Sequence, residues 1–117
     1  MKFRYDFAKF NRTIPMIDFL DNLSLREKAL ILKNIEKLIE YKNNNFNVPL
    51  RFSKYLEDGI FELKIRLPDK ISRILYFYEE QQMIIFTHGF IKKTQKVPRK
   101  EIERAKTIKE VYRRDRS

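Results

Sequence analysis

The stretch 60-IFELKIRLPDKISRILYFY-78 decides the fold. In residues 60–67 apolar and charged residues alternate, which is typical of a strand with one buried and one solvated face. A Pro-Asp-Lys turn then leads into 71–78, a second strand that is apolar on both sides. A third apolar run, 83–88, follows after four polar residues. Three consecutive strands joined by short turns predict an antiparallel meander.

Helical patterns lie on both sides of this meander. Residues 2–7 alternate as a short strand does, and 14–22 and 25–42 predict a helical hairpin whose second helix opens at a Ser-x-x-Glu capping box. A last helix is expected from Pro98 onward. The order β-α-α-β-β-β-α predicts an α+β fold with one helical layer on one face of the sheet. At 117 residues the chain can bury a real core, and we expect one domain over 1–117.

The second helix of the hairpin has a predicted buried face. Its apolar residues fall on one half of the helical wheel, and Leu30 lies off that stripe. The stripe consists of Leu25, Ala29, Ile31, Leu32, Ile35, Leu38 and Ile39.

The charge of the chain is its main pointer to function. The sequence has 26 Lys and Arg against 16 Asp and Glu, a formal net charge of +10. Folding alone gives no reason to cluster like charges, because they repel. A basic field of this kind favours polyanions, most often nucleic acid. Residues 92–100 show such clustering, since they hold five cations and no acid: Lys92, Lys93, Lys96, Arg99 and Lys100.

Composition argues against several other classes of protein. The chain has no cysteine, which removes disulfides, thiolate zinc sites and cysteine nucleophiles and agrees with a cytoplasmic protein. Its first residues lack a secretory signal pattern, and the longest uncharged run, Gln81 to Ile91, is too short for a membrane span. We therefore expect no membrane partner. The one histidine, His88, cannot supply a metal site alone, so no metal and no cofactor are expected.

Candidate site residues lie on the charged face of the meander. Alternation puts Lys64 and Arg66 on one face, and the meander brings Arg73 alongside, which would suit a phosphate backbone. Solvated pairing of Glu62 with Lys64 or Arg66 is the alternative interpretation. His88 has an unperturbed pKa near neutrality and could act as a general base, or it could be structural and donate to a backbone carbonyl.

Three segments together resemble a known family: 54-KYLEDGIFELKIR-66, 73-RILYFY-78 and 88-HGFIKKTQKVPRKEIERAK-106. They are similar to the phage-derived, HigB-like branch of the RelE toxin superfamily, and the third segment is the most specific. The resemblance implies a RelE-like fold. In this fold an N-terminal strand and a helical hairpin pack on a mainly antiparallel sheet, and a helix ends the chain.

The resemblance also implies a function, the toxin of a type II toxin–antitoxin pair. Such a toxin is a metal-independent endoribonuclease, an mRNA interferase that cuts mRNA in the ribosomal A site and so inhibits translation. Its partners would be the ribosome, mRNA and a cognate antitoxin, often a helix-turn-helix, HigA-like protein. Carried onto this sequence, the catalytic candidates are Arg66, Arg73, Lys92 and Lys93. The substrate-binding candidates are Lys64, His88, Lys96 and Arg99.

The residue inventory suits this chemistry. RNA can be cut when its own 2′-hydroxyl attacks the adjacent phosphorus, and arginines can stabilise the extra negative charge that develops. A lysine surrounded by cations is shifted toward its neutral form and can act as a base. The alternative is a non-catalytic RNA- or ribosome-binding protein that uses the same basic face. A DNA-binding regulator is disfavoured, because the hairpin over 14–42 uses its apolar surface for packing.

Overall fold

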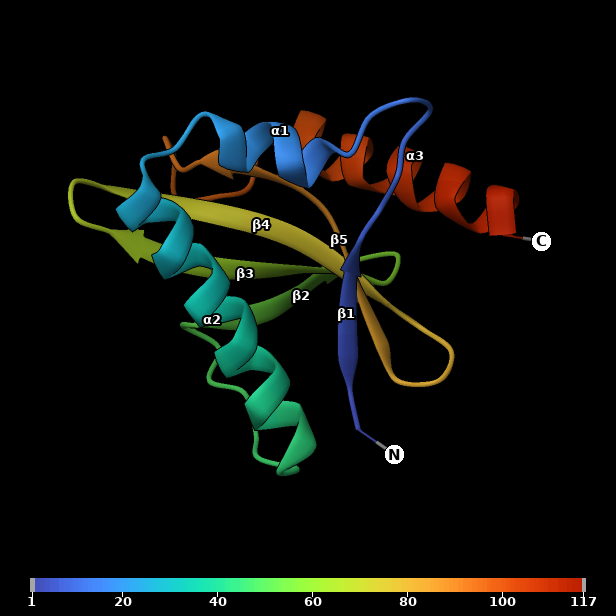
Figure 1. Cartoon of the computed structure of the whole chain (residues 1–117), viewed down its shortest axis with the longest axis horizontal. Coiled ribbons are helices and arrows are strands. Elements are labelled where there is room, and N and C mark those ends of the chain that lie inside the picture. Colours follow the sequence, from blue (N-terminus) through green and yellow to red (C-terminus); the bar gives the residue numbers. More distant parts are fainter. Residues whose placement is uncertain (1, 117) are drawn as a thin grey trace.

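The computed structural model describes residues 2–116 (Figure 1). Five strands form one sheet in the order β1-β5-β4-β3-β2, in which β1 is parallel to β5 and the other pairs are antiparallel. The predicted α+β fold with a RelE-like arrangement is confirmed. The elements in chain order are β1 (Arg4–Phe7), α1 (Pro15–Asp21), α2 (Leu25–Asn43), β2 (Ser53–Glu57), β3 (Ile60–Leu67), β4 (Lys70–Glu79), β5 (Met83–Ile91) and α3 (Arg99–Arg116).

Strand β2 is the element that the sequence analysis missed. It is joined to β3 by Asp58 and Gly59, which both have positive φ, 49° and 78°. Glu57 pairs with Ile60 across this turn. Two central residues with positive φ are the mark of a type I′ hairpin turn, for which Asp-Gly is a preferred sequence. The predicted turn at Asp58-Gly59 is therefore confirmed, and it closes a hairpin.

The register of the central strands places the charged residues. Lys64 on β3 lies opposite Arg73 on β4, and Arg73 in turn lies opposite Phe90 on β5. Strand β5 extends to Ile91, beyond the predicted end at His88. The basic segment that follows therefore begins at the same end of the sheet as Lys64.

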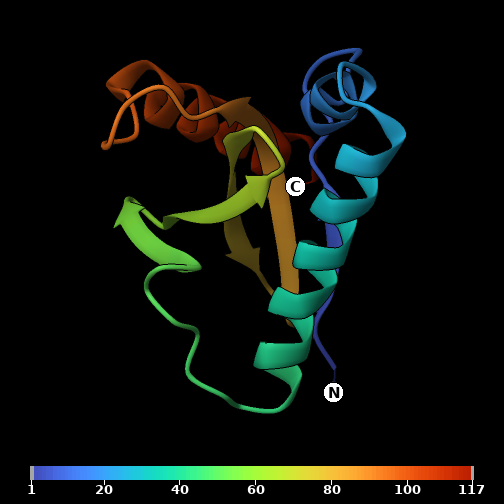
Figure 2. The same cartoon turned by 90° about the vertical axis from the view of Figure 1, so that its left-hand side faces the viewer.

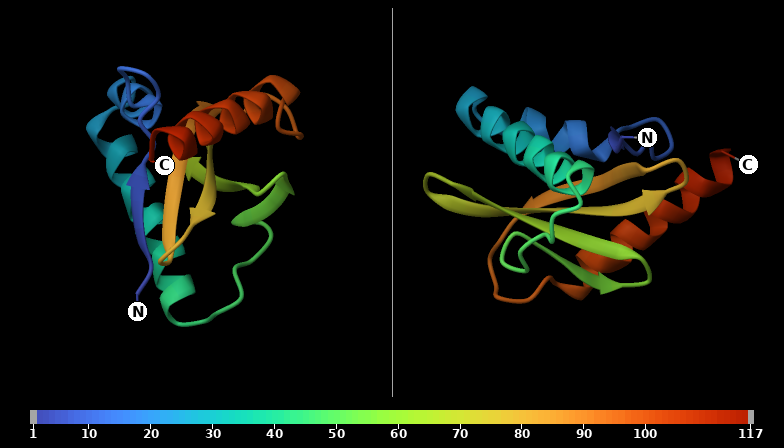
Figure 3. Two further views of the ribbon diagram at one scale, coloured as in Figure 1. Left: turned by 90° about the vertical axis from the view of Figure 1, so that its right-hand side faces the viewer. Right: turned by 90° about the horizontal axis from the view of Figure 1, so that it is seen from below.

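Helices cover both faces of the sheet, so the expected single helical layer is wrong. Figures 2 and 3 show α2 and α3 on opposite sides of the sheet. The physical reason is that β4 is apolar on both sides. Ile74 and Tyr76 belong to the core under α1 and α2, whereas Leu75 and Phe77 belong to a second core under α3.

Helix α2 buries a narrower face than the predicted stripe. Its buried residues are Ile31, Ile35 and Leu38. Leu30, which lies off the predicted stripe, packs against this core, whereas Leu25 is 83% exposed. The buried face is thus rotated toward Leu30. None of the helices within residues 2–116 combines the length and apolar character that crossing a membrane requires.

Candidate nucleic-acid interface

Four cations gather on the sheet face that α3 covers in part. Lys64 and Arg66 lie on this face of β3, since the residues that alternate with them, Leu63, Ile65 and Leu67, face the α1 and α2 side. Arg73 lies opposite Lys64. Lys92 follows β5 and remains on the sheet, because its N–H donates to the Ile71 carbonyl at 2.6 Å. We call Lys64, Arg66, Arg73 and Lys92 the basic cluster.

The basic cluster changes the acidity of Lys92. Partial burial lowers the pKa of the Lys92 ammonium below its ordinary value, and the charges of Lys64, Arg73 and Arg66 lower it further. The negative charge of Glu62 acts in the opposite direction. Lys92 therefore loses its proton more readily than an isolated lysine does.

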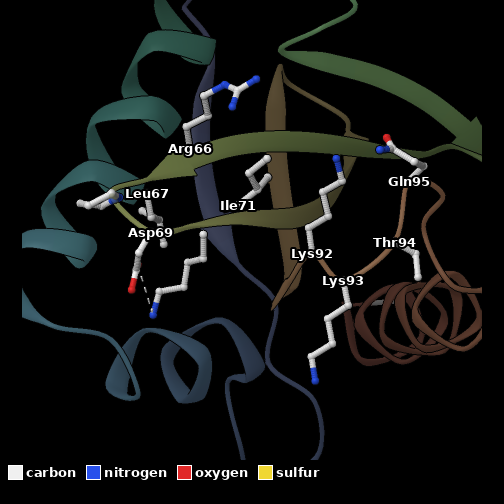
Figure 4. A pocket seen from close by; sticks show the side chains of 10 residues that line it. Arg66, Leu67, Asp69, Ile71, Lys92, Lys93, Thr94 and Gln95 are labelled. Carbon is white, nitrogen blue, oxygen red and sulfur yellow. Dashed lines mark ion pairs between the residues drawn. The ribbon is translucent and has the colours of Figure 1, made fainter.

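An open cavity of about 780 Å³ lies beside the cluster (Figure 4). Figure 4 shows that Lys92 and Arg66 point to the same side, whereas Lys93 points to the opposite side, as expected for successive residues. A smaller cavity of about 380 Å³ lies next to it, and its lining includes Arg73, Phe90, Lys92 and Lys100. The larger cavity is lined by Arg66, Leu67, Pro68, Asp69, Lys70, Ile71, Lys92, Lys93, Thr94 and Gln95.

The side chain of Arg73 is almost completely buried. Its side chain is 4% exposed, and its Nε lies 2.8 Å from Oε2 of Glu62. The contact is an ion pair without a hydrogen bond, because neither atom has a hydrogen-bond partner. The Arg73 Nη2 donates to the carbonyl of Gln95 at 2.6 Å and approaches that of Thr94 at 3.4 Å. Arg73 thus faces protein groups and presents little surface to a substrate.

Glu62 is a site residue that sequence reasoning did not identify. It is 3% exposed, and besides Arg73 its carboxylate lies 3.8 Å from Lys54 Nζ. The alternation of β3 gives the correct face for Glu62 but suggests a solvated residue. Its burial depends on the register of β3 and β4. Because Lys64 lies opposite Arg73, Glu62 is the diagonal neighbour of Arg73.

His88 is fully buried, which does not fit the substrate-binding role that the resemblance implied for it. Its Nε2 lies 3.0 Å from Oε1 of Glu101 on α3, and its Nδ1 lies 3.1 Å from the Thr87 hydroxyl. Burial is the main cause that lowers the pKa of His88 to about 4, with a further contribution from the charge of Arg104, while Glu101 acts in the opposite direction. The neutral ring donates from Nε2, since a carboxylate oxygen accepts. His88 anchors α3 to β5.

The remaining predicted cations are all exposed, and Arg99 differs from the lysines in that it pairs with acids. Lys93, Lys96 and Lys100 are exposed. Arg99 instead donates to both carboxylate oxygens of Glu57, at 2.6 and 2.7 Å, and to Glu103 at 3.0 Å. The substrate-binding role of Arg99 stays a prediction, and in the free protein Glu57 and Glu103 compensate its charge.

Comparison with known proteins identifies the family of this chain. A search of curated proteins finds no match. The family model described as "Phage derived protein Gp49-like (DUF891)" matches residues 18–110, which include the basic cluster and every other candidate residue. This family is one of the RelE and toxin–antitoxin type families. The chain therefore belongs to the phage-derived Gp49-like proteins, a toxin-like family.

Proposed function

We propose that this protein is the toxin of a type II toxin–antitoxin pair, of the HigB-like branch, and that it cuts mRNA in the ribosomal A site. The observation that carries the proposal is the convergence of Lys64, Arg66 and Lys92 beside an open cavity. An RNA phosphodiester is an anion that such a group of donors can bind. Membership of a toxin-like family supports the toxin role and suggests an antitoxin partner.

The proposed reaction is an internal transfer of the phosphodiester. Neutral Lys92 takes the proton of the 2′-hydroxyl, whose oxygen then bonds to the adjacent phosphorus. The bond from phosphorus to the 5′-oxygen breaks, and the Lys64 ammonium gives that oxygen a proton. The products are a 2′,3′-cyclic phosphate and a free 5′-hydroxyl. The Arg66 guanidinium stabilises the non-bridging oxygens, whose charge rises in the transition state.

Lys92 is the best candidate for the base among the described residues near the cavity. Its pKa is lowered, so a larger fraction is neutral at physiological pH than for an ordinary lysine. His88 is buried and both of its ring nitrogens contact other groups. Lys93 points to the opposite side and suits binding of the RNA backbone instead (Figure 4).

The exposed cations extend the interface beyond the reacting phosphate. Lys93, Lys96 and Lys100 lie in or next to the segment that leaves β5 and can contact further phosphates of mRNA or of ribosomal RNA. In the cytoplasm, an acidic segment of a helix-turn-helix, HigA-like antitoxin would cover the same cations. This partner is proposed from the charge and from the family.

Production of the protein in bacteria without an antitoxin tests the proposal. Translation should stop, and mRNA should acquire new ends with free 5′-hydroxyls. A Lys92→Ala variant, produced at the same level, is the matched control and should leave these ends at background. Normal growth with ample folded protein would contradict the toxin role. Arrest of translation without new mRNA ends would favour the non-catalytic ribosome-binding alternative.

A further inference from the structure

The segment after β5 has few attachments to the sheet. Beyond Lys92 it does not pair with a strand, and α3 begins at Arg99. Thr94 bonds within the segment, from its hydroxyl to the Lys96 carbonyl at 2.6 Å. Val97 packs against the core under α3. Among the described residues, the hydrogen bonds that join 93–97 to the sheet come from Arg73.

We propose that Arg73 is a positioning residue rather than a catalytic one, and that Glu62 and Arg73 together hold the segment 92–95 in place. The Arg73 guanidinium reaches from the middle strand of the sheet to the carbonyls of Thr94 and Gln95. This fixes the backbone next to Lys92 and so keeps Lys92 near Lys64. The inference rests on the proposed function for what Lys92 does, but the fixing of the segment is a property of the free protein.

Glu62 is needed because Arg73 is buried. A guanidinium with 4% of its side chain exposed is costly without a compensating charge. Glu62 Oε2 at 2.8 Å supplies that charge, and the Glu62 side chain is itself 4% exposed. Removal of either partner leaves a buried charge alone, whereas removal of both does not.

The geometry also argues against direct contact between Arg73 and RNA. Its Nε is buried 2.8 Å from the Glu62 carboxylate and its Nη2 donates to two carbonyls, so both nitrogens are occupied by protein groups. Arg73 borders the smaller cavity with only 4% of its side chain exposed, whereas Arg66 is exposed and lines the larger cavity. A substrate phosphate that bound Arg73 through the same nitrogens would have to displace the segment 94–95.

The first test measures the free protein. In Arg73→Gln, NMR relaxation should show increased motion of residues 93–97, and the Lys92 amide should exchange about tenfold faster or more, as for one lost charged hydrogen bond. Arg66→Gln is the matched control and should change neither. Arg73→Lys keeps the charge but loses the fork of donors, so it should also loosen the segment. A segment as rigid in both Arg73 variants as in the parent would overturn the proposal.

The second test uses the parent protein and avoids variants that fail to fold. A 2′-deoxy oligonucleotide, which cannot be cut by 2′-hydroxyl attack, is titrated while side-chain NMR signals are followed. The signals of Arg66 and Lys92 should shift on binding, and the Arg73 Nε–H signal should not. A saturable shift of the Arg73 signal to a phosphate-bound position would overturn the proposal. Failure of the oligonucleotide to bind would count against the proposed function, while the relaxation measurement still decides the role of Arg73.

A third measurement separates positioning from catalysis. Single-turnover cleavage and RNA affinity should both fall in Arg73→Gln, and both should fall in Glu62→Gln. The double variant should be no worse than the single ones, because residues that act as a unit are not additive. A catalytic Arg73 predicts instead a loss of about a hundredfold in rate at unchanged affinity, with little effect of Glu62→Gln.

Discussion

The buried His88 ring on β5 and the Glu101 carboxylate in the first turn of α3 meet at 3.0 Å, between Nε2 and Oε1. This contact fastens the C-terminal helix to the middle of the sheet. Because the ring has no exposed surface, its protonation requires an unfavourable buried charge. The burial of His88 therefore makes the stability of the fold depend on pH.

The stability of the protein should fall as the pH is lowered from about 6.5 to about 4. The pKa of His88 is lowered to about 4 in the folded state from an ordinary value of 6.5. Between these values the unfolded chain binds a proton that the folded chain does not, so acid favours unfolding. Across this pH range the free energy of unfolding should fall by at most about 3 kcal/mol, because one proton contributes ~1.4 kcal/mol for each pH unit.

Urea unfolding across this pH range checks the prediction, with His88→Gln as the control that should flatten the dependence. The upper part of the range is the most informative. The carboxylates of Glu27, Glu57 and Glu103 have lowered pKa values, so the stability they contribute is lost below about 4.5, the ordinary value of glutamate. An unfolding free energy that stays constant in the parent between about pH 6.5 and 5 would show that His88 is not held neutral by the fold.

Gly89→Ala should destabilise the fold by roughly 1–3 kcal/mol, the usual cost of an overpacked core. A Cβ at position 89 would lie 2.5 Å from Cδ2 of Phe19 on α1 and 2.8 Å from Cγ2 of Ile74. The glycine thus permits close packing of α1 on β5. Denaturant midpoints measure the loss, and Gly89→Ala combined with Phe19→Leu should recover part of it. Equal midpoints for parent and Gly89→Ala would show that Phe19 moves aside without cost.

Much of the fold could be predicted because its signals are local. The alternation of β3 sets which residues face the α1 and α2 core, and the Ser24 capping box marks the start of α2. Strand β4 carries no such signal, because its apolar residues occupy both faces. The sequence therefore could not show on which side Arg73 lies, nor that α3 occupies the face opposite α1 and α2.

The candidate site could be predicted only in part, for a similar reason. The cations of the segment after β5 are visible in the sequence, but the acids that neutralise some of them are not. Arg99 pairs with Glu57, which is 42 positions away. The partners of Arg73 and His88 likewise depend on strand register and on the docking of α3. Local patterns thus predict where charge accumulates, and long-range contacts decide which charges remain free.

Lys92→Arg should separate charge from base function. Arginine keeps a cation at this position, so RNA affinity should change little, but it does not release a proton near neutral pH. The single-turnover cleavage rate should fall by about a hundredfold or more, the usual contribution of a general base. In the parent, the rate should rise with pH until Lys92 is neutral, and the variant should lack this rise.

Lys93→Arg is the matched control for Lys92→Arg, because Lys93 points to the other side of the strand end (Figure 4). Its cleavage rate and pH profile should follow those of the parent. If Lys92→Arg cuts RNA at the parent rate, Lys92 is not the base. If Lys93→Arg loses the rate instead, the assignment of the two lysines is reversed.

The salt dependence of RNA binding should distinguish free cations from paired ones. Each phosphate contact made by an exposed lysine adds about 0.7 to the slope of log affinity against log salt for single-stranded RNA. Lys96→Gln and Lys100→Gln should therefore each lower the slope by about that amount. Arg99→Gln should leave it nearly unchanged, because Glu57 and Glu103 already compensate Arg99. Affinities of the four proteins, measured at several salt concentrations, test this contrast. A slope that falls most in Arg99→Gln would mean that RNA displaces Glu57 from this arginine.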